Sequence, residues 1–174
     1  MDSEDMLYRK LQMHLDKQTI GFPKTESGSD IALLKQLFTP AQAEVVLLLT
    51  YKSESLEQIY KRADKTGRSI EEIGRLLDQT AARGIIGIKL QDGKKEYRTI
   101  PYVVGMIEGA FFTTPPESIP ALGAAHARYS EDGLFWRAFM NSRIPQMRTI
   151  PIQKSITPKH HIGNCCRSSK NVFL

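Results

Sequence analysis

The residues best suited to metal chemistry in this 174-residue chain lie near its C-terminus, where His160 and His161 precede Cys165 and Cys166. Zinc prefers imidazole and thiolate ligands, but it needs four of them placed tetrahedrally, and adjacent cysteines converge poorly on one ion. The chain has no other cysteine, so a disulfide framework is excluded. We expect a polar tail without a metal, and a metal-binding or redox-active tail is the least favoured of three functional hypotheses.

Motifs that carry catalysis are missing from the sequence. It contains no phosphate-binding loop, dinucleotide-binding glycine motif, serine nucleophile motif or paired-histidine zinc motif. His14 and His126 stand alone and are expected at the surface or in local hydrogen bonds. We therefore predict that the chain is no enzyme and needs no cofactor.

Basic and acidic residues are distributed unevenly along the chain. The net charge is +5. All 19 acidic residues lie at or before Asp132, whereas seven basic residues lie after it. The first 132 residues thus carry 17 bases against 19 acids. The basic character belongs to the C-terminal quarter and not to the preceding domain, so the net charge by itself does not indicate a nucleic-acid-binding domain.

The N-terminal sequence argues against secretion and membrane insertion. It begins with acidic residues and has no cationic segment followed by an apolar one, and the longest aliphatic run is Val45–Leu49. We expect a cytoplasmic protein without a membrane partner.

Apolar spacing and capping residues predict a series of helices. Residues 4–17 should form an amphipathic helix with Leu7, Leu11 and Leu15 in one narrow stripe, which must pack on the main domain or on a second copy. The segment 21–30 is rich in glycine, proline and serine, a composition that predicts a linker. The next helix should be capped by Ser29 or Asp30.

Three further helices are predicted between residues 39 and 84. Thr39 and Gln42 form a capping box with Pro40 at the first helical position, and another helix should follow from about 55 to 65. Ser69 and Glu72 form a second capping box, and Gly84 should end that helix.

A β-hairpin should follow these helices. Asp92-Gly93 favours a two-residue type I′ turn, which would place Lys89 opposite Glu96 and Ile88 opposite Tyr97. Beyond the hairpin, 102–112 is predicted to be helical and to pack on the domain or on a second subunit, 113–123 to be a loop, 132–143 to be helical and 147–156 to be a strand.

These elements predict a mainly α fold with a small β-hairpin. The arrangement is that of a winged helix-turn-helix domain with N- and C-terminal helical extensions. Its expected parts are an N-terminal helix over 1–20, a winged-helix domain over 21–112, and a linker, helix and basic tail over 113–174.

The helix after Ser69 occupies the place of a DNA-recognition helix, so its outward face decides whether it can read bases. That face should carry Glu71, Glu72 and Asp78 against two arginines, although a groove-binding helix depends on basic and amide side chains. The candidate nucleic-acid-binding residues on this helix and on the wing are Arg75, Gln79, Arg83, Lys89, Lys94, Lys95 and Arg98.

Residues 21–112 and 146–156 are similar to a known family. The stretches "IALLKQLFTPAQAEVVLLLTYKSESLEQIYKR", "SIEEIGRLLDQTAARGIIGIKLQDGKKEYRTIPYVVGMIEGAFF" and "MRTIPIQKSI" resemble the N-terminal winged-helix region of anaerobe 4Fe-4S ferredoxin-type proteins. The resemblance implies electron transfer by a downstream cluster domain, but four thiolates are needed for each cubane. Cys165 and Cys166 cannot supply them, which suggests a truncated or out-of-frame product.

The leading hypothesis is therefore a non-catalytic winged-helix module. It would be the regulatory or docking part of an iron–sulfur redox protein whose cluster domain is missing, and it would contact a protein partner or itself through the leucine stripe or residues 102–112. The alternative is a DNA-binding transcriptional regulator.

Overall fold

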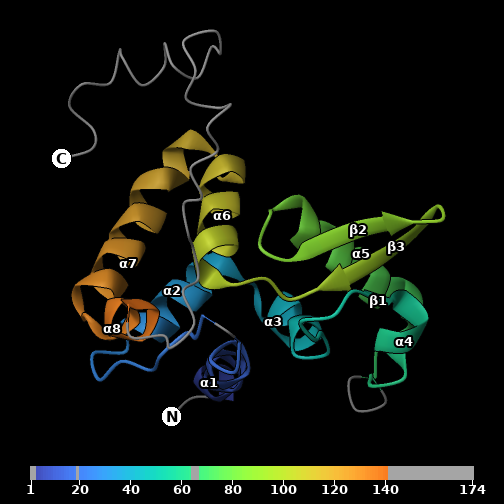
Figure 1. The fold of residues 1–174 in the computed structure, drawn as a ribbon, viewed down its shortest axis with the longest axis horizontal. Helices are drawn as coiled ribbons and strands as arrows, with labels where there is room; N and C mark the ends of the chain where they lie inside the picture. The colour runs from blue at the N-terminus through green and yellow to red at the C-terminus, as the bar shows by residue number, and fades with distance from the viewer. Residues whose placement is uncertain (1–2, 19, 64–66, 141–174) are drawn as a thin grey trace, which may run out of the picture. The chain divides into compact units, whose positions relative to one another are not determined.

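The computed structural model describes residues 3–18, 20–63 and 67–140, which lie in the first of the two units into which the chain divides. This unit is mainly helical and contains a small three-stranded antiparallel sheet (Figure 1). Its helices and strands, in chain order, are α1(Ser3–Leu15), α2(Ser29–Leu37), α3(Pro40–Val46), β1(Glu54–Ser55), α4(Leu56–Tyr60), α5(Ile70–Ala82), β2(Gly87–Gln91), β3(Lys94–Arg98), α6(Ile107–Thr113), α7(Ile119–Glu131) and α8(Leu134–Met140).

The capping predictions for α3 and α5 hold in different degrees. Thr39 and Gln42 form the complete capping box. At α5, the Ser69 hydroxyl accepts from the Glu72 backbone amide, but the Glu72 carboxylate turns to Arg68 instead of returning to Ser69. Gly84 follows the last turn with φ +66°, the left-handed conformation expected after a helix end.

The hairpin prediction is confirmed in turn and register. Asp92 and Gly93 have φ of 51° and 75°, as a type I′ turn requires. Lys89 pairs with Glu96 and Ile88 with Tyr97. The short strand β1 adds to the free side of β3, so the strand order is β1-β3-β2.

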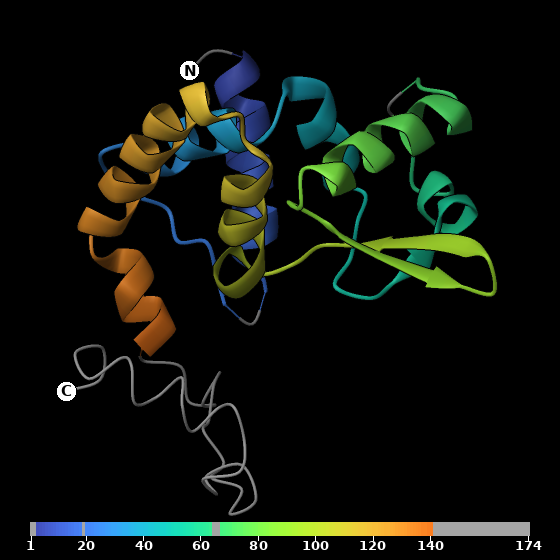
Figure 2. The ribbon, with the colours of Figure 1, turned by 90° about the horizontal axis from the view of Figure 1, so that it is seen from above.

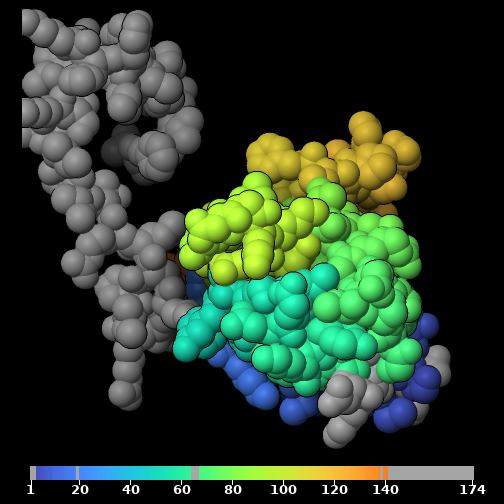
Figure 3. Space-filling view, turned by 90° about the vertical axis from the view of Figure 1, so that its right-hand side faces the viewer, coloured from blue at the N-terminus to red at the C-terminus, as the bar shows by residue number. Residues whose placement is uncertain are grey.

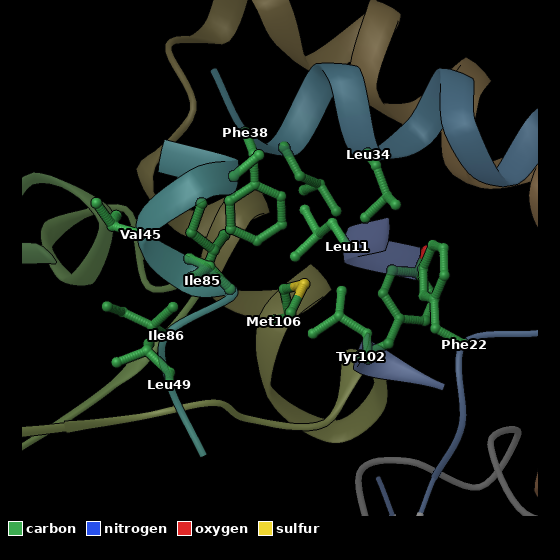
Figure 4. Packing of buried hydrophobic residues seen from close by; sticks show 14 of the residues in the cluster. Leu11, Phe22, Leu34, Phe38, Val45, Leu49, Ile85, Ile86, Tyr102 and Met106 are labelled. Atoms are coloured by element: carbon green, nitrogen blue, oxygen red, sulfur yellow. The ribbon is translucent and has the colours of Figure 1, made fainter. Parts of the chain in front are cut away.

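The leucine stripe of α1 packs into the core of its own chain. Leu11 and Leu15 are buried, and α1 contacts α2 and α3. Figure 4 shows Leu11 among Leu34 of α2, Phe38 at the end of α2 and Met106 at the start of α6. Each such buried side chain stabilises the fold by roughly 1.5–3 kcal/mol through apolar burial.

Residues 21–28 are irregular and Ser29 and Asp30 already belong to α2, so the predicted linker over 21–30 is part of the packed domain. Phe22 is fully buried, and its carbonyl accepts from the Gln12 amide at 2.6 Å. Asp30 is also buried and forms an ion pair with Arg9 at 2.5 Å, so its carboxylate does not cap α2 as predicted. Gly28 occupies the N-cap position instead, without a side-chain cap.

The segment after the hairpin departs from the predicted helix over 102–112. Val103 and Val104 have extended backbone, and α6 begins only at Ile107. Here α6 lies between α7 and the hairpin (Figure 2). Packing on the domain, one of the two predicted placements, is therefore the one observed, with Met106, Ile107 and Ala110 buried.

The predicted loop over 113–123 is wrong in its second half. Residues Ile119–Glu131 form α7, which packs along α2. Pro120 lies in the first turn, where a proline costs the helix no hydrogen bond. The predicted helix over 132–143 appears as α8, whereas the predicted strand over 147–156 lies outside the described residues.

Candidate nucleic-acid interface

The candidate interface consists of α5 and the hairpin, which share one face of the molecule with α4 (Figure 3). Helix α5 buries Ile73, Leu76 and Leu77 beneath this face. Its outward residues Glu71, Arg75 and Gln79 are exposed.

The acidic first turn of α5 is stabilised by the helix end itself. Hydrogen bonds from its own backbone amide and from the Ser69 hydroxyl lower the pKa of the Glu71 carboxyl. Glu72 pairs with Arg68, which also holds Glu44 at 2.7 Å. Negative charge at this end of a helix is favoured by the backbone dipole but disfavours an approaching phosphate.

Arg75 and Gln79 lie four residues apart on the exposed face of α5, where side chains at this spacing are neighbours. Neither forms a side-chain hydrogen bond or ion pair with another described residue. Arg75 is the only basic residue of α5.

Arg83, at the C-terminal end of α5, points into the protein. Its guanidinium donates to the Leu37 carbonyl at 2.5 Å and to the Gln36 carbonyl and Gln42 side-chain oxygen at 3.3 Å. Burial lowers the pKa of this guanidinium. Arg83 thus joins α5 to the end of α2, so its donors are already used within the chain.

Lys95 on the hairpin is also engaged, by an acid of α5. Its ammonium donates to both carboxylate oxygens of Asp78 at 2.8 Å, and the Tyr97 hydroxyl donates to one of them at 2.8 Å. Burial raises the pKa of the Asp78 carboxyl, but these hydrogen bonds outweigh that effect and the net shift is downward. The contact fixes the hairpin against α5.

The remaining candidate cations lie on the opposite face of the hairpin. Lys95 and Tyr97 reach α5, and strand side chains alternate between faces, so Lys94, Glu96 and Arg98 point away from it. Cross-strand pairing places Lys89 on that second face, opposite Glu96. Lys89 also donates to the Gln91 side chain at 2.5 Å.

The seven predicted residues therefore do not form a single surface. Arg75 and Gln79 remain together on α5, Arg83 and Lys95 are engaged internally, and the other three occupy the far face of the hairpin. The pairing of Asp78 with Lys95 and Tyr97 joins residues 17 and 19 positions apart, and no local sequence pattern indicates it.

Other kinds of site receive little support within the described part of the chain. No group of three or more histidine, cysteine, aspartate or glutamate side chains there could hold a metal ion. His160, His161, Cys165 and Cys166 lie outside it. None of its helices is both long enough and apolar enough to cross a bilayer.

Comparison with protein-family models, with curated proteins and with solved structures found no match to this chain.

Proposed function

We propose that residues 40–98 form the helix-turn-helix and wing of the winged-helix domain predicted over residues 21–112. Three helices with a short strand between the first two, followed by a hairpin, are the element order of that architecture. In it, β1 would extend the wing through its pairing with β3, and α5 would occupy the position of the recognition helix.

We further propose that this domain is a non-catalytic module that acts through protein contact. The proposal rests on the observation that charged side chains around α5 are already paired with one another: Asp78 with Lys95 and Glu72 with Arg68. A helix that binds a duplex gains affinity mainly from basic side chains directed at phosphates. Arg75 alone, beside Glu71, is a weak basis for such binding.

Exposed apolar side chains on the hairpin support protein contact. Leu90 is 72% exposed and Ile88 is 47% exposed. Both lie on the same hairpin face as Tyr97, beside α5. Exposed aliphatic side chains next to one another favour a protein surface over a phosphate backbone. The leucine stripe of α1 is buried and is no part of this proposal.

The likeness of residues 21–112 to the N-terminal region of 4Fe-4S ferredoxin-type proteins supports one class of protein. On that basis we propose that the module is the regulatory or docking part of an iron–sulfur redox protein. This assignment to an iron–sulfur redox protein rests on the resemblance of the sequence to that family.

Photocrosslinking tests the protein-contact proposal. A photoreactive amino acid is placed at Leu90, and the cells that make the protein are irradiated. The expected result is one discrete product in which the protein is cross-linked to a protein partner. The same residue in place of Met13, which is 57% exposed on α1, is the matched control and should give none. Equal products from both positions, or none from Leu90, would contradict docking through the hairpin.

The second candidate is a DNA-binding regulator, favoured by the exposed, unengaged pair Arg75 and Gln79. Titration of a mixed 30-base-pair duplex at low and moderate salt separates the two functions. If the module acts by protein docking, it should bind the duplex only weakly, and Arg75→Ala should leave that DNA affinity unchanged. Tight binding that falls steeply with salt and is lost in Arg75→Ala, but not in Lys10→Ala on α1, would favour the regulator.

A further inference from the structure

An open cleft of about 570 Å³ lies where the last turn of α1 approaches two segments of the central domain. The walls come from the end of α1, from residues 49–51 after α3, and from residues 98–101 after β3. This cleft is separate from the α5 surface considered above.

Cationic side chains line the cleft without acidic ones. Lys17 and Arg98 contribute to its lining, and no carboxylate does. Neither cation forms a hydrogen bond or ion pair with another described residue. The adjacent carboxylate of Glu54 is held by Arg62 at 2.8 Å and by the Thr50 hydroxyl at 2.7 Å. The lining therefore carries two cationic side chains and no carboxylate, which favours an anionic ligand.

His14 adds a polar group of defined protonation. Its Nε2 lies 2.9 Å from the Leu49 carbonyl oxygen, and because a carbonyl only accepts, Nε2 carries the proton. Burial lowers the pKa of the ring, so at neutral pH Nδ1 is an unprotonated acceptor. The ring fixes the end of α1 to the Leu49 wall.

The remaining lining is largely apolar. Leu49 and Pro101 belong to it, together with the ring of Tyr51, which is 71% exposed. Apolar walls with a few convergent charged groups are typical of sites for small organic molecules, and the volume lies within the usual range of such sites.

We propose that this cleft binds a small organic anion, with a carboxylate or phosphate held by Lys17 and Arg98 and an apolar or aromatic body against Leu49, Tyr51 and Pro101. Because its walls come from α1 and from the end of β3, the bound molecule would link the N-terminal helix to the sheet. The site does not depend on the function proposed for α5 and the hairpin.

The test uses the full chain and two fluorescent probes that share one aromatic body. 8-Anilino-1-naphthalenesulfonate carries an acidic group, and N-phenyl-1-naphthylamine lacks it. We expect the sulfonate probe to bind at one site per chain. Lys17→Gln and Arg98→Gln should each weaken that binding roughly tenfold, since hydrogen bonds to charged groups have that magnitude. Neither substitution should change binding of the neutral probe.

Lys10→Gln, an exposed lysine of α1 outside the cleft, is the matched control and should bind both probes as the wild type does. Circular dichroism checks that each variant is folded. Because Arg98 also contacts Gly87, Lys17→Gln decides the outcome if Arg98→Gln does not fold.

Displacement of the sulfonate probe identifies the acidic group. Benzoate and phenyl phosphate distinguish a carboxylate from a phosphate, and benzyl alcohol is the neutral control. The proposal is overturned if Lys17→Gln binds the sulfonate probe as tightly as the wild type, if both probes lose affinity equally, or if neither acid displaces the probe.

Discussion

The backbone of Gly109 in α6 lies directly on the backbone of Gly84 at the end of α5. A Cβ placed on Gly109 would be 2.1 Å from the Gly84 carbonyl oxygen, a distance that no side chain tolerates. The Thr113 hydroxyl donates to the Arg83 carbonyl at 2.9 Å beside this contact. The two glycines thus allow α6 to pack on the end of α5.

Gly109→Ala is therefore expected to lower the free energy of unfolding by about 1–3 kcal/mol, because backbone must move to admit the methyl group. Gly123→Ala is the control: it lies within α7, and nothing lies within 4 Å of its Cβ position. Alanine there should stabilise the helix by up to about 1 kcal/mol. Urea denaturation measures both, and equal effects would contradict a close backbone contact.

Arg83→Ala should destabilise the protein by roughly 1–3 kcal/mol, since it leaves the Leu37 and Gln36 carbonyls without their charged donor. Arg75→Ala is the matched substitution on the same surface and should change stability by less than about 0.5 kcal/mol. Thermal unfolding of the two variants tests this difference. A larger loss in Arg75→Ala would mean that the two arginines have been assigned the wrong roles.

Asp78→Asn should destabilise the protein in a pH-dependent manner. The folded-state pKa of Asp78 is below its ordinary value of 3.8, so the charged carboxylate stabilises the fold above that pH and ceases to do so as pH falls through the lowered pKa. Stabilities of wild type and Asp78→Asn should differ at pH 6 and converge below about pH 3.8. Parallel curves at all pH values would show that Asp78 acts only by packing.

His126 makes stability depend on pH in a higher range than Asp78 does. The Tyr102 hydroxyl lies 2.5 Å from Nδ1, and burial lowers the pKa of the ring below its ordinary 6.5. The unfolded chain therefore binds the proton more readily, and stability falls as pH drops below about 6.5 towards the folded-state pKa.

His126→Gln should reduce that fall, as measured by urea denaturation at pH 7.5 and 5.5. Tyr102→Phe, which retains the imidazole, should preserve it. His14, whose pKa is also lowered, contributes equally in every variant. An unchanged pH dependence in His126→Gln would assign the effect to other groups.

Features determined by a few neighbouring residues could be predicted from the sequence. The Thr39 capping box, the Asp92-Gly93 turn and the pairing of Lys89 with Glu96 each depend on groups within about eight positions of one another. Such contacts close short loops, so the local residue types are sufficient to specify them.

Tertiary contacts alone determined the features that the sequence did not predict. The segment around Phe22 has the composition of a linker, yet a core formed by distant helices buries it. Arg83 has the exposed position expected on a helical wheel, but the end of α2 lies within reach of its guanidinium. Asp78 likewise meets Lys95 only because the hairpin folds over α5. Burial and charge pairing between distant segments depend on the packed arrangement, and no short sequence window contains both partners.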